Sequence, residues 1–316
     1  MNTKSFLIAA VITLSTAFSG CAIAQSSNGN DTIRVGTYNV RLSAGDKGTP
    51  NAWANRKDDI VVFMKNLNLD VFGLQEVRPD QAKHFDNAFK DYQKFGEHRA
   101  ADRVSDEASP IYFRTNIFEC IKGGTFWLSE TPDIPGSKSW KTACPRICSW
   151  AILKNRKNGK VFCFANTHTD HRSALARKEG MLLVIKRMKD FAPAGTPIVF
   201  TGDHNCRETD EPAEAVSKIL VNALYTSKTP PEGPWRTFSG WKVDNEISTA
   251  EALKFPRKER NANVSADGKV KFGPRIDYIY VSPSIKVLTY KTHADLRPGT
   301  KLYHSDHHPV TAEIEL

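Results

Sequence analysis

Short apolar runs alternate along the chain with segments whose apolar positions follow a helical period. Runs of this kind, bounded by polar or turn-forming residues, are typical of buried strands. Gly123-Gly124 is expected to form a turn within the longest of them. The expected strands are 33–40, 70–75, 111–128, 147–153, 160–166, 197–201, 276–282, 285–290 and 308–315.

Helices are expected between these strands. Ile60, Phe63, Met64 and Leu67 recur at i, i+3, i+4 and i+7, which predicts an amphipathic helix over 53–67. Further helices are expected at 82–89, at 173–190 with Ser173 as N-cap, and at 211–221. Because the helices are too few for a purely parallel sheet, the pattern favours an α/β (α+β) protein with two mixed sheets packed together and helices outside.

Residues 226–272 form a long polar stretch rich in Pro, Gly and Lys. It is too long for an ordinary connection between two elements. We expect either a mobile flap over a site or a surface insertion. The domain as a whole is expected to span 32–316.

The first 24 residues are expected to be a signal peptide, followed by a Ser/Asn/Gly-rich linker over 25–31. The apolar run 6–18 is too short for a membrane span. Ala22-Ile23-Ala24 would release a soluble protein, whereas the sequence ending at Cys21 resembles a bacterial lipobox and would give a lipid-anchored one. Both alternatives predict an exported protein, either periplasmic or secreted.

Five cysteines follow Cys21, and an odd number in an exported protein leaves at least one thiol unpaired. Cys144 and Cys148 lie close enough in sequence for a local disulfide. Cys163 falls in an expected strand, where a buried, unreactive thiol is typical. The cysteine spacing fits no structural zinc motif.

The formal net charge is +9. It suits an anionic partner such as a phosphodiester, a lipid headgroup or a polyanion, although a mild excess spread over a large surface has no such meaning. The densest basic cluster is 254–260. Nothing in the sequence implies a protein partner, and we expect a monomer.

Metal-binding and proton-transferring side chains recur at the ends of the expected strands. Open sheets tend to place their sites along one such rim. Carboxylates and amides gathered there suit a hard divalent cation such as Mg²⁺ or Mn²⁺ and phosphate chemistry. These residues are Asn39, Glu76, His168, Asp203, Asn205, Asp277, Asp306 and His307.

The motifs that contain these residues occur in one particular order. They are Thr37-Tyr38-Asn39-Val40-Arg41, Leu74-Gln75-Glu76-Val77, Asn166-Thr167-His168, Gly202-Asp203-His204-Asn205, Arg275-Ile276-Asp277-Tyr278-Ile279 and Ser305-Asp306-His307-His308-Pro309. Over 33–316 the chain resembles the endonuclease/exonuclease/phosphatase superfamily. The resemblance implies a four-layer αββα sandwich with two mixed, largely antiparallel sheets. The segment Gly124–Pro132, with Trp140 and Arg146, resembles a bacterial subgroup that is not defined by a substrate.

The resemblance also implies roles for these residues. Asn39, Glu76 and Asp306 would bind Mg²⁺ or Mn²⁺. His307 and Asp277 would form a dyad that positions or activates the water, or stabilises charge at the phosphorus, and Asp203 would lie near the attacking water. The general base stays open between Asp203 and His307.

The resemblance further implies that Asn205 donates to a phosphate oxygen. His168 would donate to the phosphate or protonate the leaving oxygen. Arg41 and Arg172 are candidates for substrate phosphate contacts or for surface ion pairs. His171, His204 and His308 adjoin the motifs and are expected outside the site, because adjacent strand residues face opposite ways.

The family motifs imply phosphoester cleavage but not the identity of the ester. We expect first a phosphodiesterase or nuclease-like enzyme, with Trp235, Phe238, Trp241 and Phe255 beside the basic cluster as a track for nucleic acid or as the insertion's own core. The alternative is a phosphatase or phospholipase acting on lipid, inositol or sugar phosphates. A remote alternative is a non-catalytic binding protein.

Overall fold

The computed structural model describes residues 31–244 and 246–316. The expected signal peptide, Cys21 and most of the expected linker lie outside the described residues. Residues 31–316 form one compact unit. No helix in the described ranges is both long enough and apolar enough to cross a membrane.

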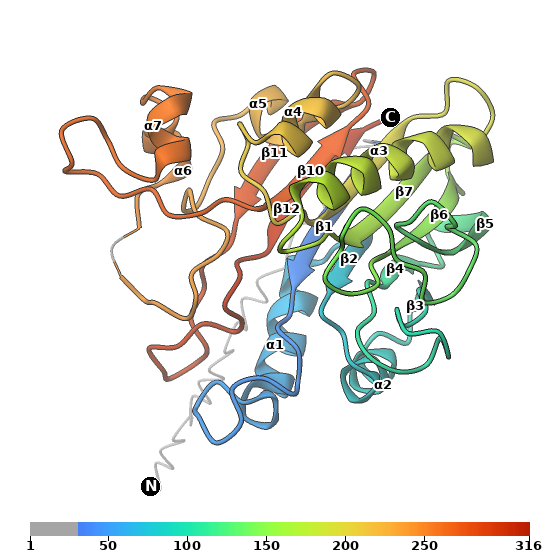
Figure 1. Cartoon of the computed structure of the whole chain (residues 1–316), viewed down its shortest axis with the longest axis horizontal. Coiled ribbons are helices and arrows are strands. Elements are labelled where there is room, and N and C mark those ends of the chain that lie inside the picture. Colours follow the sequence, from blue (N-terminus) through green and yellow to red (C-terminus); the bar gives the residue numbers. More distant parts are fainter. Residues whose placement is uncertain (1–30, 245) are drawn as a thin grey trace, which may run out of the picture. The chain divides into compact units, whose positions relative to one another are not determined.

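Two mixed six-stranded sheets form the centre of this unit (Figure 1). In each sheet one neighbouring pair is parallel, β1 with β2 and β7 with β8, and the other pairs are antiparallel. The first sheet has the order β11 (Lys286–Thr292), β12 (Val310–Glu315), β1 (Thr32–Asn39), β2 (Val71–Gln75), β4 (Ile111–Arg114) and β3 (Tyr92–Phe95). The second has the order β5 (Phe118–Trp127), β6 (Ile147–Asn155), β7 (Val161–His168), β8 (Ile198–Asp203), β10 (Asp277–Val281) and β9 (Val221–Asn222).

Helices flank the sheets on the outside. α1 (Trp53–Leu67) and α2 (Pro79–Ala88) cover the first sheet, and α3 (Ala174–Phe191) and α4 (Glu211–Ser217) cover the second, as the shared apolar clusters show. Ser173 caps α3, as predicted, because its side chain accepts from the Ala176 N–H. Three short helices, α5 (Ala223–Thr226), α6 (Thr249–Ala252) and α7 (Arg257–Ala262), follow. The predicted arrangement of two mixed sheets between helices is confirmed.

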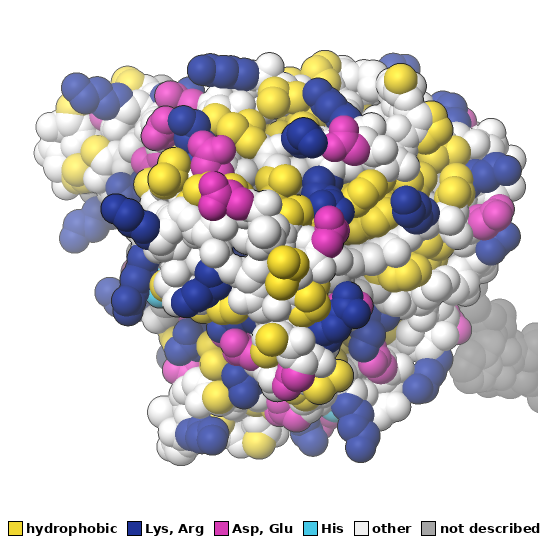
Figure 2. Space-filling view, turned by 45° about the vertical axis from the view of Figure 1, so that its right-hand side comes forward, with side chains coloured by type: hydrophobic (Ala, Val, Ile, Leu, Met, Phe, Trp, Pro, Cys, Tyr) yellow, Lys and Arg dark blue, Asp and Glu magenta, His cyan; other side chains and the backbone are white. Residues whose placement is uncertain are grey.

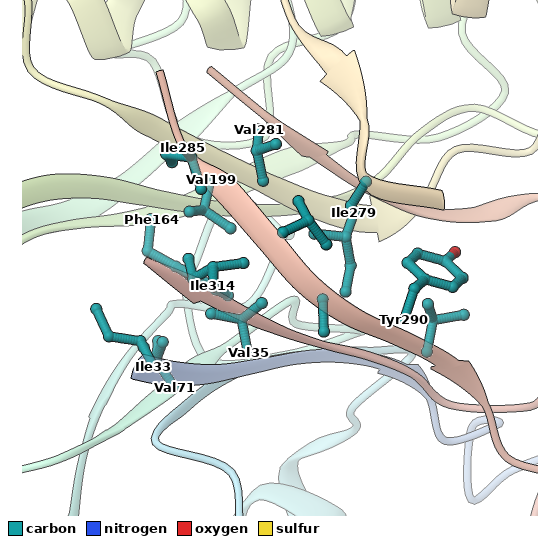
Figure 3. Close-up of a cluster of buried hydrophobic side chains, with 14 of the residues drawn as sticks. Ile33, Val35, Val71, Phe164, Val199, Ile279, Val281, Ile285, Tyr290 and Ile314 are labelled. Atoms are coloured by element: carbon teal, nitrogen blue, oxygen red, sulfur yellow. The ribbon is translucent and has the colours of Figure 1, made fainter. Parts of the chain in front are cut away.

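The largest apolar cluster lies between the two sheets (Figure 3). Val35 and Val71 from the first sheet face Phe164, Val199 and Ile279 from the second. All five side chains are essentially inaccessible to water. Burial of this apolar surface holds the sheets face to face and so fixes the rim where their strand ends meet.

Two local predictions were wrong. Gly123 and Gly124 lie inside β5, and the turn is at 115–117. Position 123 requires glycine, because a Cβ there would lie 3.0 Å from the Trp150 carbonyl oxygen and 3.1 Å from the Phe95 ring. The helix expected to reach 221 ends at Ser217, because Val221 pairs with β10.

The polar stretch 226–272, expected as a flap or a surface insertion, packs partly into the core of the domain. Trp235, Ala252 and Phe272 belong to the cluster between the sheets. The guanidinium groups of Arg260 and Arg275 both lie 5.1 Å from the centroid of the Trp235 ring. This stretch therefore shares its core with the two sheets.

The disulfide that the spacing of Cys144 and Cys148 would allow is not formed. All five described cysteines are free thiols. Cys148 is buried in β6 and packs in the cluster beneath α3, so its side chain is committed to the core. Cys163 is buried in β7, as predicted.

The close contact between the sheets makes Gly73 sensitive to substitution. A Cβ at Gly73 would lie 2.2 Å from Asn166 Oδ1, whereas one at Gly124 would meet its nearest neighbour at 3.6 Å. We expect Gly73→Ala to lower the free energy of unfolding by about 1–3 kcal/mol, the usual range for overpacking, and Gly124→Ala to change it far less. Equal midpoints for the two variants in urea unfolding would contradict this account.

Candidate active site

The predicted site residues meet at one rim of the sandwich. Parallel pairing sets His168 at the end of β7 opposite Asp203 at the end of β8. Antiparallel pairing sets Asp203 opposite Asp277, the first residue of β10. Three site residues have positive φ values, Arg41 at 56°, Glu76 at 62° and Asn205 at 47°. Such strained backbone is uncommon for residues other than glycine and clusters at functional sites.

The side-chain amide of Asn39 joins the two sheets. Its Nδ2 donates to Glu76 Oε1 and to Asp203 Oδ2, both at 3.0 Å. The Arg41 N–H donates to Asn39 Oδ1, which fixes the orientation of the amide. Glu76 Oε2 accepts in turn from the Leu42 N–H at 2.9 Å. The amide and the carboxylate are therefore held in place by backbone contacts.

Asp306 lies near Glu76 in a mostly buried position. Burial is the main cause that raises the pKa of Asp306, and the negative charge of Glu76 adds to it. Arg41 Nη1 lies 3.6 Å from Asp306 Oδ2, while its Nε bonds to Asp46 at 2.9 Å. Two carboxylates and an amide that crowd in this way form the donor set that a hard divalent cation takes.

A second set of donors lies beside the first. One ligand atom each from Asp203, Asp277 and His307 can be chosen so that all three lie within 4.8 Å of one another. His307 Nδ1, however, is hydrogen-bonded to Asp277 Oδ2 at 2.9 Å. Either set has the composition of a metal site, but a protonated imidazole cannot serve as a ligand.

The charge state of His307 follows from its neighbours. Burial on its own lowers the pKa of His307, but the charges of Asp277 and Asp203 outweigh burial and raise the pKa to about 10. Asp203 Oδ2 lies 3.7 Å from His307 Nε2. Burial and then the charge of Asp277 raise the pKa of Asp203 to about 7. The neighbouring carboxylates thus favour the protonated form of His307, and burial favours protonation of Asp203.

The pKa of His168 is shifted in the opposite direction to that of His307, so its neutral form is favoured. Asn205 Nδ2 donates to the Thr169 carbonyl and to His168 Nε2, at 3.1 and 2.9 Å. With Nε2 accepting, the ring carries its proton on Nδ1, which lies 4.0 Å from Glu107 Oε2. Burial, and then the charge of Arg146, lower the pKa of His168. This neutral tautomer has no proton to give at Nε2, which weighs against the expected role as an acid.

The sequence matches the Endonuclease/Exonuclease/phosphatase family over residues 36–307. The chain belongs to this family. The structure is similar to that of a Bacteroides thetaiotaomicron mannosyl-6-phosphatase, with 31% identity and a TM-score of 0.75 over 90% of this chain and 100% of that one. A family protein from Bacteroides vulgatus has 28% identity and a TM-score of 0.76 over 90% of this chain and 99% of that one.

More distant structures share the fold. The catalytic domain of human Nocturnin has 17% identity and a TM-score of 0.64 over 90% of this chain and 94% of that one. The chain matches none of the curated proteins. The chain thus belongs to a family whose members are phosphoester hydrolases.

Sequence reasoning missed a second layer of charged residues behind His168. Arg99 makes paired bonds to Glu107, both 3.0 Å long. Arg146 is 5% exposed, donates to His171 Nδ1 at 2.9 Å, and lies 4.0 Å from Asp170. These residues come from loops and not from strand ends, so no strand-end pattern marks them. The one available signal was Arg146 in the segment typical of the bacterial subgroup.

The two predicted arginines differ in position. Arg41 reaches Asp306 and is half-buried. Arg172 is exposed, and its backbone N–H donates to Asp170 Oδ1. Within the described part of the chain its side chain makes no hydrogen bond or ion pair with the site. The structure therefore supports a place in the site for Arg41 and gives none to Arg172.

The three neighbouring histidines point away from the rim, as predicted. His204 is buried and stacks on Tyr280 with ring centroids 5.5 Å apart. His308 Nε2 bonds to Glu246 Oε1 at 3.1 Å, and His171 contacts Arg146. Their side chains support the walls of the site.

The Asp277 charge is predicted to keep His307 protonated. Asp277→Asn should lower the pKa of His307, measured by NMR titration of the imidazole in metal-free protein. Because the pKa of His307 is raised in the folded protein, its protonation stabilises the fold. This contribution is complete below pH about 6.5, the pKa of an unfolded histidine, and is lost as the pH rises towards about 10. The stability advantage of the wild type over Asp277→Asn should therefore shrink over that window. Asp267→Asn, at an exposed carboxylate, is the control, and an identical His307 titration in all three proteins would contradict the assignment.

Proposed function

We propose that the protein is a metal-dependent phosphatase that hydrolyses small, polar phosphate monoesters such as sugar phosphates. The observation that carries the proposal is the convergence at one rim of two kinds of group. The oxygen donors Glu76 and Asp306 lie beside the proton-exchanging Asp203 and the His307–Asp277 pair. This combination supports hydrolysis by an activated water.

Asn39, Glu76 and Asp306 are the residues that would hold the ion, Mg²⁺ or Mn²⁺. They are oxygen donors, whereas in the set of Asp203, Asp277 and His307 the Nδ1 atom of His307 is already bonded to Asp277 Oδ2. When bound, the ion supplies positive charge that offsets the negative charge of the phosphate.

The chain's own residues carry the proton and the charge during the reaction. Asp203 accepts the proton of the attacking water, because its pKa lies near neutrality. The protonated form of His307 stabilises negative charge on a phosphate oxygen, and Asn205 Nδ2 donates to another by giving up its bond to the Thr169 carbonyl. His168, held neutral, orients Asn205 through the 2.9 Å bond. Direct attack by water forms a new bond to phosphorus as the bond from phosphorus to the ester oxygen breaks, and the leaving oxygen takes its proton from solvent, without a covalent enzyme intermediate.

Two observations favour a monoester over a nucleic acid. The expected aromatic track is incomplete, because Trp235 is 2% exposed and Phe255 packs against the core between the sheets, which leaves Phe238 and Trp241 partly exposed. In the basic cluster, Arg260 is buried against Glu208. On the face shown in Figure 2, positive and negative side chains are interspersed. The similarity to a mannosyl-6-phosphatase points the same way.

A substrate panel tests the proposal. It contains p-nitrophenyl phosphate, mannose 6-phosphate, bis-p-nitrophenyl phosphate, plasmid DNA and RNA, each with Mg²⁺, Mn²⁺ or EDTA. We expect monoesters to be hydrolysed at least ten times faster than diesters, a threshold that corresponds to about 1.4 kcal/mol, and EDTA to abolish turnover. Preferred cleavage of DNA or RNA would instead establish the nuclease-like function predicted from sequence.

The metal assignment predicts the effect of one substitution. Glu76→Gln should lower kcat/KM by at least about 100-fold, since even residues behind metal ligands contribute about 10–100-fold. Glu119→Gln removes the same charge from an exposed position in β5 and should behave as the wild type. Full activity of Glu76→Gln would contradict the assignment of Glu76 as a metal ligand.

The expectation that the protein is exported comes from its sequence. The proposal is that the chain is carried out of the cytoplasm by residues 1–24, either released or tethered through lipid on Cys21. Cys21→Ala should move the protein from the membrane to the soluble fraction if it is tethered. Unchanged fractionation would favour soluble export into the periplasm or medium.

A further inference from the structure

A cavity of about 690 Å³ adjoins the proposed catalytic residues. Two parts of the 226–272 stretch and the segment that follows it enclose the cavity. Its lining includes Arg236, Phe238, Gly240, Lys242, Lys271 and Phe272. None of these residues has a role in the proposed chemistry, so the cavity needs its own explanation.

The cavity and the site share a wall. The Phe238 ring lies 4.9 Å from the His307 ring, centroid to centroid. The N–H groups of Ser239 and Gly240 donate to the Asp306 carbonyl oxygen at 2.8 and 3.1 Å. A phosphate held at His307 would lie beside Phe238, the residue that the site and the cavity share.

The other side of the site is closed. The paired bonds between Arg99 and Glu107 and the buried Arg146 fill the space behind His168. These groups are largely inaccessible, with exposed side-chain fractions of 12% for Arg99 and 14% for Glu107. The geometry thus favours the cavity beside Phe238 as the place for the leaving group.

The wall of the cavity is hydrogen-bonded to the segment that contains His307. Glu246 Oε1 accepts from His308 Nε2 at 3.1 Å and from the Tyr303 hydroxyl at 3.0 Å. Arg236 Nη2 lies 2.5 Å from the same oxygen and 2.7 Å from Asp244. Because His308 follows His307 directly, the cavity is preformed and does not depend on a ligand to organise it.

The lining has the chemistry of hydroxyl recognition. Arg236 is 9% exposed, and its Nε has no hydrogen-bond partner; Glu246 Oε2 also has none. Both atoms are shut off from solvent, and the acceptor that a ligand can reach in this lining is the exposed carboxylate of Asp244. Lys242 and Lys271 add exposed donors at the border. Of the two aromatic rings in the lining, Phe272 is 2% exposed and Phe238 is half-buried.

We propose that this cavity binds the leaving group of the substrate and that the leaving group is a sugar, a polyhydroxylated body that uses both donors and acceptors. The proposal rests on the phosphatase function and adds its substrate class. The half-buried Phe238 gives the apolar face of the sugar ring a surface to pack on, and the lysines bind hydroxyls at the border.

Paired lysine variants test the proposal. Lys242→Ala combined with Lys271→Ala removes two border donors, and Lys269→Ala combined with Lys286→Ala removes equal charge at exposed positions outside the cavity. The substrates are mannose 6-phosphate, glucose 6-phosphate and methyl phosphate. All three carry the same phosphate charge, so the comparison isolates contacts with the sugar.

We expect the cavity variant to raise KM for the two hexose phosphates at least about five-fold, the factor for one hydrogen bond of about 1 kcal/mol, with kcat nearly constant. Its KM for methyl phosphate should change less, and the control variant should follow the wild type. Equal effects on all three substrates, or no effect, would overturn the sugar-binding role.

Calorimetry keeps this test separate from the phosphatase proposal. Mannose 6-phosphate and inorganic phosphate are titrated into Glu76→Gln protein with and without the two cavity substitutions. Weaker binding of the sugar phosphate alone supports the cavity assignment even if no monoester is hydrolysed. Equal weakening of both ligands, or of neither, contradicts the assignment even if the phosphatase function holds.

Discussion

The hydrogen bond from Asn39 Nδ2 to Asp203 Oδ2 is the contact on which the site depends. The first sheet carries the oxygen donors Asn39 and Glu76, and the second carries Asp203 with Asn205 and His168. This bond links the two halves of the site directly, and the bond between His307 and Asp277 is a second link between them. Any change in the spacing of the sheets would therefore separate the ion-binding groups from the proton-exchanging ones.

Burial gives these groups their chemical properties. Asp203, Asp277 and His307 are all at most 5% exposed, so their charges act on one another with little screening by water. That is why the pKa of Asp203 rises towards neutrality and that of His307 rises above it. The carboxylates Glu76 and Asp306 add negative charge nearby, which a bound cation would offset. The same packed interface thus explains the fold, the charge states and the expected need for a metal.

The sequence predicted the features that local pattern controls. Most strands, the cap at Ser173 and the rim residues from Asn39 to His307 follow from apolar runs and the polar residues at their ends. It could not predict contacts made by loops, such as Arg99 with Glu107 or Arg146 with His171, because long-range packing alone brings them together. The glycines in β5 were misread as a turn for the same reason, since the requirement for Gly123 comes from the Phe95 ring. The role of 226–272 likewise depends on where Trp235 packs.

The most direct test is a crystal structure with Mn²⁺ and inorganic phosphate, with the ion located by its anomalous scattering. The account predicts Mn²⁺ bound by Glu76 and Asp306, and the phosphate between His307 and Asn205 on the side open to Phe238. Mn²⁺ bound instead by Asp203, Asp277 and His307 would contradict the account, because those residues would then be ligands and not the groups that move the proton and stabilise the phosphate.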